Sequence, residues 1–147
     1  MDGIDHRILR ELSRDGRISN LALSERVALS PSACLRRVTA LERQGIIQGY
    51  RAVLDAEKLG VGFVAYLMVG LTDHTKAGQE IFERAAAEAP EVIECHNITG
   101  AYEYLLRIEA RDIADYKRLH TDVLGVLPHL GSLTTYVVVG SPKDGRG

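Results

Sequence analysis

Apolar residues recur with a helical period near the start of the chain. Ile4, Ile8 and Leu12 lie four residues apart, a spacing that places their side chains on one face of a helix. Ser19 is a good N-cap for a second helix and Ser30 for a third, because a serine hydroxyl accepts from a free amide of the first turn. The proline directly after Ser30 strengthens this start, since position N1 has no intrahelical bond to lose. Three short helices are therefore predicted.

Glycines mark the expected ends of these helices. We expect Gly16 to end the first helix in the left-handed conformation and Gly45 to end the third. Residues 46–54 then read as a hairpin-like β-ribbon with Gly49 at its turn. Three helices followed by a ribbon predict a winged helix-turn-helix.

The second half of the chain changes its period. Segments typical of strands and helices follow one another in the order β-α-β-β-α-β. The expected segments are 63–71, 75–89, 92–99, 102–110, a helix capped by Asp112 with Ile113, Tyr116, Leu119 and Val123 on its buried face, and 132–139. This order predicts a ferredoxin-like domain, and the whole chain is predicted to be an α+β protein.

The pattern predicts two domains and a short connection. Residues 1–54 form the helix-turn-helix domain with its ribbon, residues 55–62 the linker, and residues 63–147 the ferredoxin-like domain. Helices cover only one face of a ferredoxin-like sheet, and the strand at 63–71 is apolar on both sides. We therefore expect a homodimer formed through the open sheet face.

Charge is distributed unevenly along the chain. The net charge is −2, yet residues 26–51 contain five arginines and one glutamate, a local charge of +4. The third helix turns Cys34, Val38 and Leu41 inward, so its polar side chains face outward. The residues expected to contact double-stranded DNA are Ser30, Ser32, Arg36, Arg37, Thr39, Arg43 and Arg51.

These residues suit different parts of a DNA duplex. Ser32 and Arg36 can reach base edges, and arginine bidentate to guanine is the commonest specific contact. Arg43 and Arg51 suit phosphates, which give affinity without sequence information, and Arg37 lies toward the edge of the groove. Arginines that simply hydrate an exposed helix face would give the same pattern.

Combined motifs in both halves resemble one family. The first half contains DGRIS at 15–19, LSPS at 29–32, RV at 37–38, LE at 41–42, GII at 45–47 and GY at 49–50. The second half contains ECH at 94–96, TGAYEYLL at 99–106 and TYVV at 135–138. Together they resemble the Lrp/AsnC (feast/famine) transcription regulators, especially the leucine-responsive branch, over nearly the whole chain.

The resemblance implies a sequence-specific DNA-binding regulator that responds to an amino acid and has neither cofactor nor enzymatic activity. It implies dimers joined through the C-terminal (RAM-type) domains and assembled into tetramers or octameric rings, with the effector bound between dimers near the Gly100 turn. The implied effector residues are Asn97, Thr99, Gly100, Ala101, Tyr102, Glu103 and Tyr136.

Two departures from the family pattern affect these expectations. Ala28 stands where the family usually has glycine, in the turn between the two DNA-binding helices. The family's turn after the second strand often reads Gly-Asp-Phe/Tyr-Asp, whereas this chain has Ala101 and Glu103 at the two acidic positions. Glu103 could pair with an effector's ammonium group from a displaced position.

Other functions are weaker alternatives. The runner-up is an architectural DNA-wrapping protein with little effector response, and an enzyme or regulatory subunit of amino-acid metabolism ranks below it. Cys95 and His96 are adjacent on a strand, so they point to opposite faces and do not suit one metal ion. No apolar run is long enough to span a membrane, and we expect a cytoplasmic protein.

Overall fold

The computed structural model describes residues 1–145. The chain divides into two compact units, one formed by Met1–Val53 and the other beginning at Leu54. The first unit contains α1 (Gly3–Arg14), α2 (Asn20–Arg26) and α3 (Pro31–Arg43). The predicted caps are present: the Ser19 hydroxyl accepts from the Ala22 N–H, and the Ser30 hydroxyl accepts from the Ala33 N–H. The buried core of this unit consists of Ile8, Leu23, Val27, Cys34 and Leu41.

The helices α2 and α3 end in the same hydrogen-bonded turn. After α2, the Ala28 N–H donates to Glu25 O and the Leu29 N–H to Ser24 O. After α3, the Gly45 N–H donates to Glu42 O. Both turns require a left-handed residue, and the φ angles are 56° at Ala28 and 73° at Gly45. The turn between α2 and α3 is therefore made without glycine, at the cost of backbone strain at Ala28.

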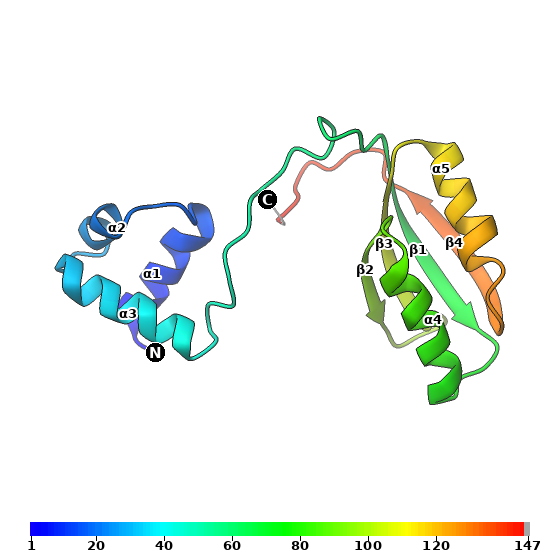
Figure 1. Cartoon of the computed structure of the whole chain (residues 1–147), viewed down its shortest axis with the longest axis horizontal. Helices are drawn as coiled ribbons and strands as arrows, with labels where there is room; N and C mark the ends of the chain where they lie inside the picture. Colours follow the sequence, from blue (N-terminus) through cyan, green and yellow to red (C-terminus); the bar gives the residue numbers. More distant parts are fainter. Residues whose placement is uncertain (146–147) are drawn as a thin grey trace. The chain divides into compact units, whose positions relative to one another are not determined.

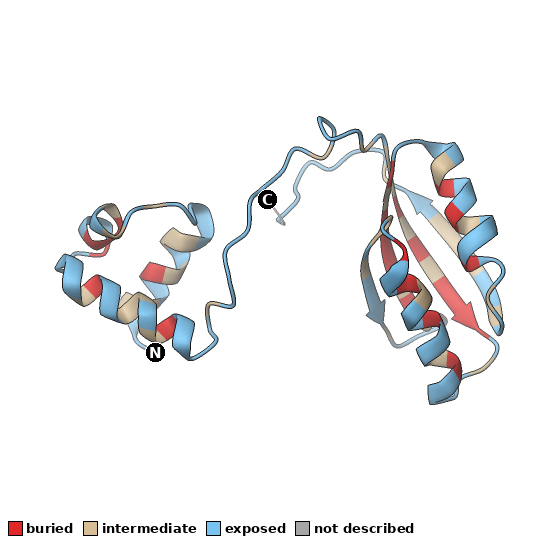
Figure 2. Cartoon of the chain, in the orientation of Figure 1, coloured by how far each residue is buried: buried red, intermediate tan, exposed pale blue. Residues whose placement is uncertain are grey.

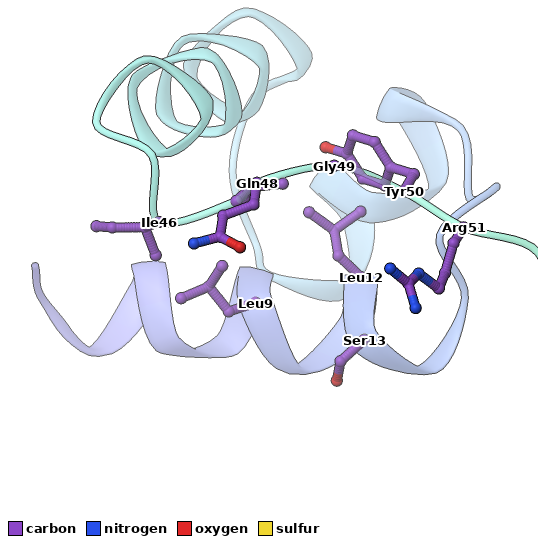
Figure 3. A pocket seen from close by; sticks show the side chains of 9 residues that line it. Leu9, Leu12, Ser13, Ile46, Gln48, Gly49, Tyr50 and Arg51 are labelled. Atoms are coloured by element: carbon purple, nitrogen blue, oxygen red, sulfur yellow. The ribbon is translucent and has the colours of Figure 1, made fainter. Parts of the chain in front are cut away.

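The predicted β-ribbon is wrong, because residues 46–54 form no strand. The segment runs alongside α1 in an extended course (Figure 3), and Gly49 does not have a positive φ. Gly16, which was predicted to end α1 in the left-handed conformation, does not have a positive φ either. A two-stranded hairpin without a third strand is marginal in water. Here the Tyr50 ring instead lies beside Gly16, and a Cβ at position 16 would lie 3.5 Å from the ring.

Residues 55–60 form a single capped turn. The Asp55 side chain accepts from the Lys58 N–H at 3.1 Å. Gly60, with a φ of 95°, closes the turn, since the Val61 N–H donates to Ala56 O. The predicted linker therefore has local structure of its own.

The second unit confirms the predicted β-α-β-β-α-β order. Its elements are β1 (Phe63–Leu71), α4 (Lys76–Glu88), β2 (Val92–Asn97), β3 (Tyr104–Ala110), α5 (Ile113–Arg118), the π-helix η1 (Leu119–Leu124) and β4 (Leu130–Val137). The antiparallel sheet has the order β2-β3-β1-β4. Helices α4 and α5 cover one face of it (Figure 1), and the buried residues lie between helices and sheet (Figure 2).

The π-helix changes which residues of the last helical segment are buried. Ile113 and Val123, predicted on the buried face, are 69% and 38% exposed, whereas Tyr116, Leu119 and Leu124 are buried. A π-turn spans five residues instead of four. The apolar stripe therefore passes from Leu119 to Leu124 and leaves Val123 outside.

Candidate DNA-binding and effector surfaces

The outward face of α3 carries most of the predicted DNA-binding residues. Ser32, Arg36, Thr39 and Arg43 are all exposed. They line a shallow groove together with Leu35 and Ala40. Within the described chain the guanidinium groups of Arg36 and Arg43 have no ion-pair partner. The structure thus brings two free cations and two hydroxyls together on one helix face.

Arg37 lies on a different side of α3, facing α1. One of its terminal nitrogens (Nη1) lies 2.8 Å from Asp2 Oδ2 and 3.2 Å from Asp5 Oδ1. Hydrogen bonding to Arg37 is the main cause that lowers the Asp2 pKa to about 2, and the same contacts raise the pKa of Arg37. These ion pairs were not predicted, although the acidic Asp2 and Asp5 at the start of α1 are possible partners for an arginine.

Two further predicted DNA contacts occupy other places in the first unit. The Ser30 hydroxyl is the cap of α3, 3.2 Å from the Ala33 nitrogen, and it lies 3.4 Å from the Ser32 hydroxyl. Arg51 lies beside a hollow above α1 that Leu12, Gln48 and Tyr50 also line (Figure 3). Ser30 therefore shapes the start of α3, and Arg51 is separate from the groove on its outer face.

The predicted effector residues gather at the turn between β2 and β3. Gly100 has a φ of 115°, a conformation that favours glycine. The Asn97 amide donates to Glu103 O at 3.2 Å, and the Ile98 N–H donates to the same oxygen at 2.9 Å. Thr99 and Ala101 are exposed at the tip of the turn. These bonds fold the turn back on itself.

The carboxylate of Glu103 is already engaged inside the chain. Its Oε2 accepts from the Leu71 N–H at 2.8 Å, and its Oε1 lies 2.9 Å from His74 Nδ1. Only 18% of the side chain is exposed. Gly70 leaves room for the nearby Ser132 hydroxyl, which would lie 2.6 Å from a Cβ at this position, whereas Glu103 Oε2 would lie at an ordinary contact distance of 3.7 Å. Glu103 therefore fastens the end of β1 to the turn.

The two predicted tyrosines lie in different surroundings. The Tyr102 hydroxyl lies 3.0 Å from the Thr134 hydroxyl, which links the turn to β4. Tyr136 is 57% exposed and pairs in register with Tyr66 of β1, so it stands on the open sheet face beyond the turn. Sequence reasoning had not identified His74 or Thr134.

In residues 1–145, no three or more His, Cys, Asp or Glu side chains converge to hold a metal ion. No helix in that part of the chain is both long and apolar enough to cross a bilayer.

Comparison with known families gives two matches that follow the division of the fold. Residues 1–48 match a winged helix-turn-helix DNA-binding model, and residues 64–147 match the Lrp/AsnC ligand binding domain. The chain is 42% identical over 144 residues to the proline dehydrogenase transcriptional activator of Rhizobium radiobacter, covering 98% of this chain and 92% of that protein. It is 41% identical to the leucine-responsive regulatory protein of Escherichia coli K12, covering 98% and 88% of the two chains.

A solved structure agrees with these sequence relatives. A transcriptional regulator of Neisseria meningitidis, solved as a complex with L-methionine, superposes with a TM-score of 0.94 at 35% identity, covering 98% of this chain and 93% of that one. The fold and the matches define a transcription regulator with a DNA-binding helix-turn-helix and an amino-acid-binding domain. The chain belongs to the Lrp/AsnC family. Its relatives are transcription regulators, not enzymes, and the family binds amino-acid effectors rather than cofactors.

Proposed function

We propose that the outer face of α3 reads operator sequence in the major groove. Ser32, Arg36 and Thr39 face base edges, and Arg43 and Arg51 meet phosphates. The observation that carries this proposal is the pair of exposed, unpaired cations Arg36 and Arg43 on one face of a firmly held helix. An α-helix fits the major groove, where arginine recognises guanine O6 and N7 together.

Arg37 and Ser30 support this surface as positioning residues. Arg37 ties the flank of α3 to the start of α1 through Asp2 and Asp5. Ser30 caps the first turn of α3, and the Asn20 amide of α2 donates to Pro31 O at 2.8 Å. These contacts fix the entry of α3, which any base-reading geometry requires.

Arg36→Ala tests the DNA-reading proposal. Binding sites are first selected from random duplexes, and affinities are then measured by fluorescence anisotropy for the selected site and its single-pair variants. We expect a loss of about 1–3 kcal/mol confined to one base position. Arg84→Ala, an exposed arginine of α4, is the matched control and should bind as the unmodified protein does. Equal weakening at all sequences would instead assign Arg36 to a phosphate. A weak sequence preference of the unmodified protein, with a steep salt dependence, would favour an architectural DNA-wrapping protein.

We further propose that the effector site is completed by a second copy of the chain. Three polar side chains of the turn make contacts within the chain: Asn97 with Glu103 O, Glu103 with Leu71 and His74, and Tyr102 with Thr134. An amino acid carries both an ammonium and a carboxylate group, and each needs a partner when it is removed from water. Thr99, Gly100 and Ala101 form an exposed tip of this turn. A neighbouring chain that packs against this tip supplies the partners for the two charged groups of the ligand.

We also propose that the chain forms a homodimer through the open sheet face. Tyr66, Met68 and Leu105 on this face lack the helices that cover the opposite side. Arg107 is 7% exposed here, and its Nη1 donates to the Tyr66 hydroxyl. Its Nε lies 3.7 Å from Glu109 Oε2 and makes no hydrogen bond with a described residue. A second sheet would bury the apolar side chains and offer Arg107 an acceptor. Tetramers or octamers then follow from contacts between dimers at the Gly100 turns.

A thermal-shift panel of the twenty amino acids tests effector binding. A ligand present at 100 times its dissociation constant stabilises the fold that binds it by about 2.7 kcal/mol. We expect one chemical class, such as branched aliphatic residues, to raise the melting temperature. Gly100→Ala should weaken that shift, because alanine is strained at a φ of 115°. A shift of equal size in Gly100→Ala would remove this turn from the effector site.

A further inference from the structure

We propose that Leu35 reads the methyl group of thymine, so that it selects an A·T pair at one position of the operator half-site. The inference rests on the proposed function, in which the outer face of α3 enters the major groove. It adds a specificity-determining residue that neither the sequence pattern nor the arginine distribution had pointed to.

Leu35 is not a core residue. It is 56% exposed, and the buried cluster of the first unit is complete without it. Cys34 and Leu41 from the same helix are buried in that cluster, and Val38 packs against it. Folding therefore does not require an apolar side chain at position 35.

The place of Leu35 on α3 puts it among the DNA-facing residues. It lines the shallow groove together with Ser32, Arg36, Thr39, Ala40 and Arg43. Residues three and four apart on a helix are neighbours, so Leu35 stands between Ser32 and Thr39. A helix that presents this groove to the base edges therefore presents Leu35 together with Arg36.

The chemistry of the groove then limits what Leu35 can contact. Base edges in the major groove present donors and acceptors, and the one apolar group among them is the C5 methyl of thymine. Leucine placed against any other edge would remove water from polar groups without replacing their hydrogen bonds. Thymine is therefore the base that Leu35 favours.

The surrounding charge favours DNA over a protein as the occupant of this surface. Arg36 and Arg43 line the same groove as Leu35 and have no ion-pair partner in the described chain. An apolar protein surface would leave these two cations without partners, whereas a duplex offers them guanine and phosphate acceptors.

Deoxyuridine substitution tests this assignment because it removes only the methyl group. The full chain is used to select duplexes from random sequence, and each thymine of the selected site is then replaced in turn by deoxyuridine. For the unmodified protein we expect one thymine per half-site whose replacement weakens binding about fourfold, the effect of one buried methyl group. Leu35→Ala should bind the thymine and deoxyuridine forms of that site equally well.

Two further variants sharpen the result. Leu21→Ala removes a leucine of α2 that is 59% exposed and does not line the groove, so it should keep the fourfold preference. Leu35→Met keeps an apolar side chain and should keep most of the preference. Melting temperatures of the Leu35 variants should equal that of the unmodified protein, since Leu35 is outside the core.

Three results would overturn the assignment. A sequence-selective protein that is insensitive to deoxyuridine at every thymine would overturn the role of Leu35 alone. An undiminished fourfold effect in Leu35→Ala would do the same. A protein that selects no sequence at all would overturn both the DNA-reading proposal and the role of Leu35.

Discussion

The outer face of α3 and the turn between β2 and β3 treat their charged side chains in opposite ways. On α3, Arg36 and Arg43 are exposed and have no ion-pair partner among the described residues. At the turn, Glu103 is largely covered, accepts from the Leu71 N–H and lies against His74. One surface has its charges available for a ligand, and the other uses its charge to hold the fold.

This difference indicates how far each site is complete within one chain. A DNA-binding surface needs free cations and a rigid helix, and one copy of the first unit provides both. An amino-acid site needs free donors and acceptors on two sides of a small ligand, and the turn has most of its polar side chains bonded internally. We therefore infer that DNA reading belongs to the single chain and effector recognition to the assembly.

The largest expected effect is that of Glu103→Ala on the stability of the turn between β2 and β3. The substitution leaves the Leu71 N–H without its acceptor and removes the contact with His74. We expect the second unit to lose about 2 kcal/mol of unfolding free energy, measured by urea denaturation. Glu103→Gln keeps an acceptor oxygen and should lose clearly less. Unchanged stability in Glu103→Ala would mean that the carboxylate is free for an effector.

Substitutions in the turns at the ends of α2 and α3 should have smaller effects on the stability of the DNA-binding unit. Ala28→Gly should stabilise the first unit by up to about 1 kcal/mol, because it relieves a non-glycine residue at a φ of 56°. Gly45→Ala should destabilise it by about 1 kcal/mol through backbone strain alone, since a Cβ at Gly45 meets no atom within 4 Å. Opposite signs in thermal denaturation are the expected result, and equal signs would contradict the shared geometry of the two turns.

The smallest effect concerns the acid stability of the pair that holds α3 against α1. The Asp2 pKa is about 2 in the folded chain, below its ordinary value of 3.8. Its contribution is therefore complete above pH 3.8 and is lost as the pH falls toward 2. Asp2→Asn should flatten the fall of stability over this range, whereas Glu57→Gln, at an exposed carboxylate of the linker, should not. If Asp2→Asn left the dependence of stability on acid pH unchanged, the ion pair between Asp2 and Arg37 would not contribute to the stability of the first unit.

Local signals predicted much of the fold. Ser19, Ser30 and Asp112 cap helices as expected, because capping depends on a few neighbouring amides. The β-α-β-β-α-β order was also predictable from alternation and turn residues. The extended segment at 46–54, where a ribbon was predicted, could not be anticipated, since strand pairing depends on a partner strand that the sequence pattern does not identify.

The sequence predicted which residues lie in the candidate sites better than it predicted which residues contact one another. The outward position of Ser32, Arg36 and Arg43 follows directly from helical spacing. The engagement of Arg37 by Asp2, across 35 positions of sequence, depends on how α1 packs against α3. The contact between Glu103 and the Leu71 N–H likewise depends on β1 and β3 being neighbours in the sheet. Long-range pairs of this kind leave no local signal.

The comparison is tested most directly by sedimentation velocity of the full chain at several protein concentrations, with and without the amino acid found in the thermal-shift panel. A ligand that binds between copies must stabilise the larger assembly, because binding and association are linked. We expect saturating effector to shift the distribution from dimers toward higher oligomers. An effector that binds tightly and leaves this distribution unchanged at every concentration would mean that one chain holds the complete site, which would contradict the account.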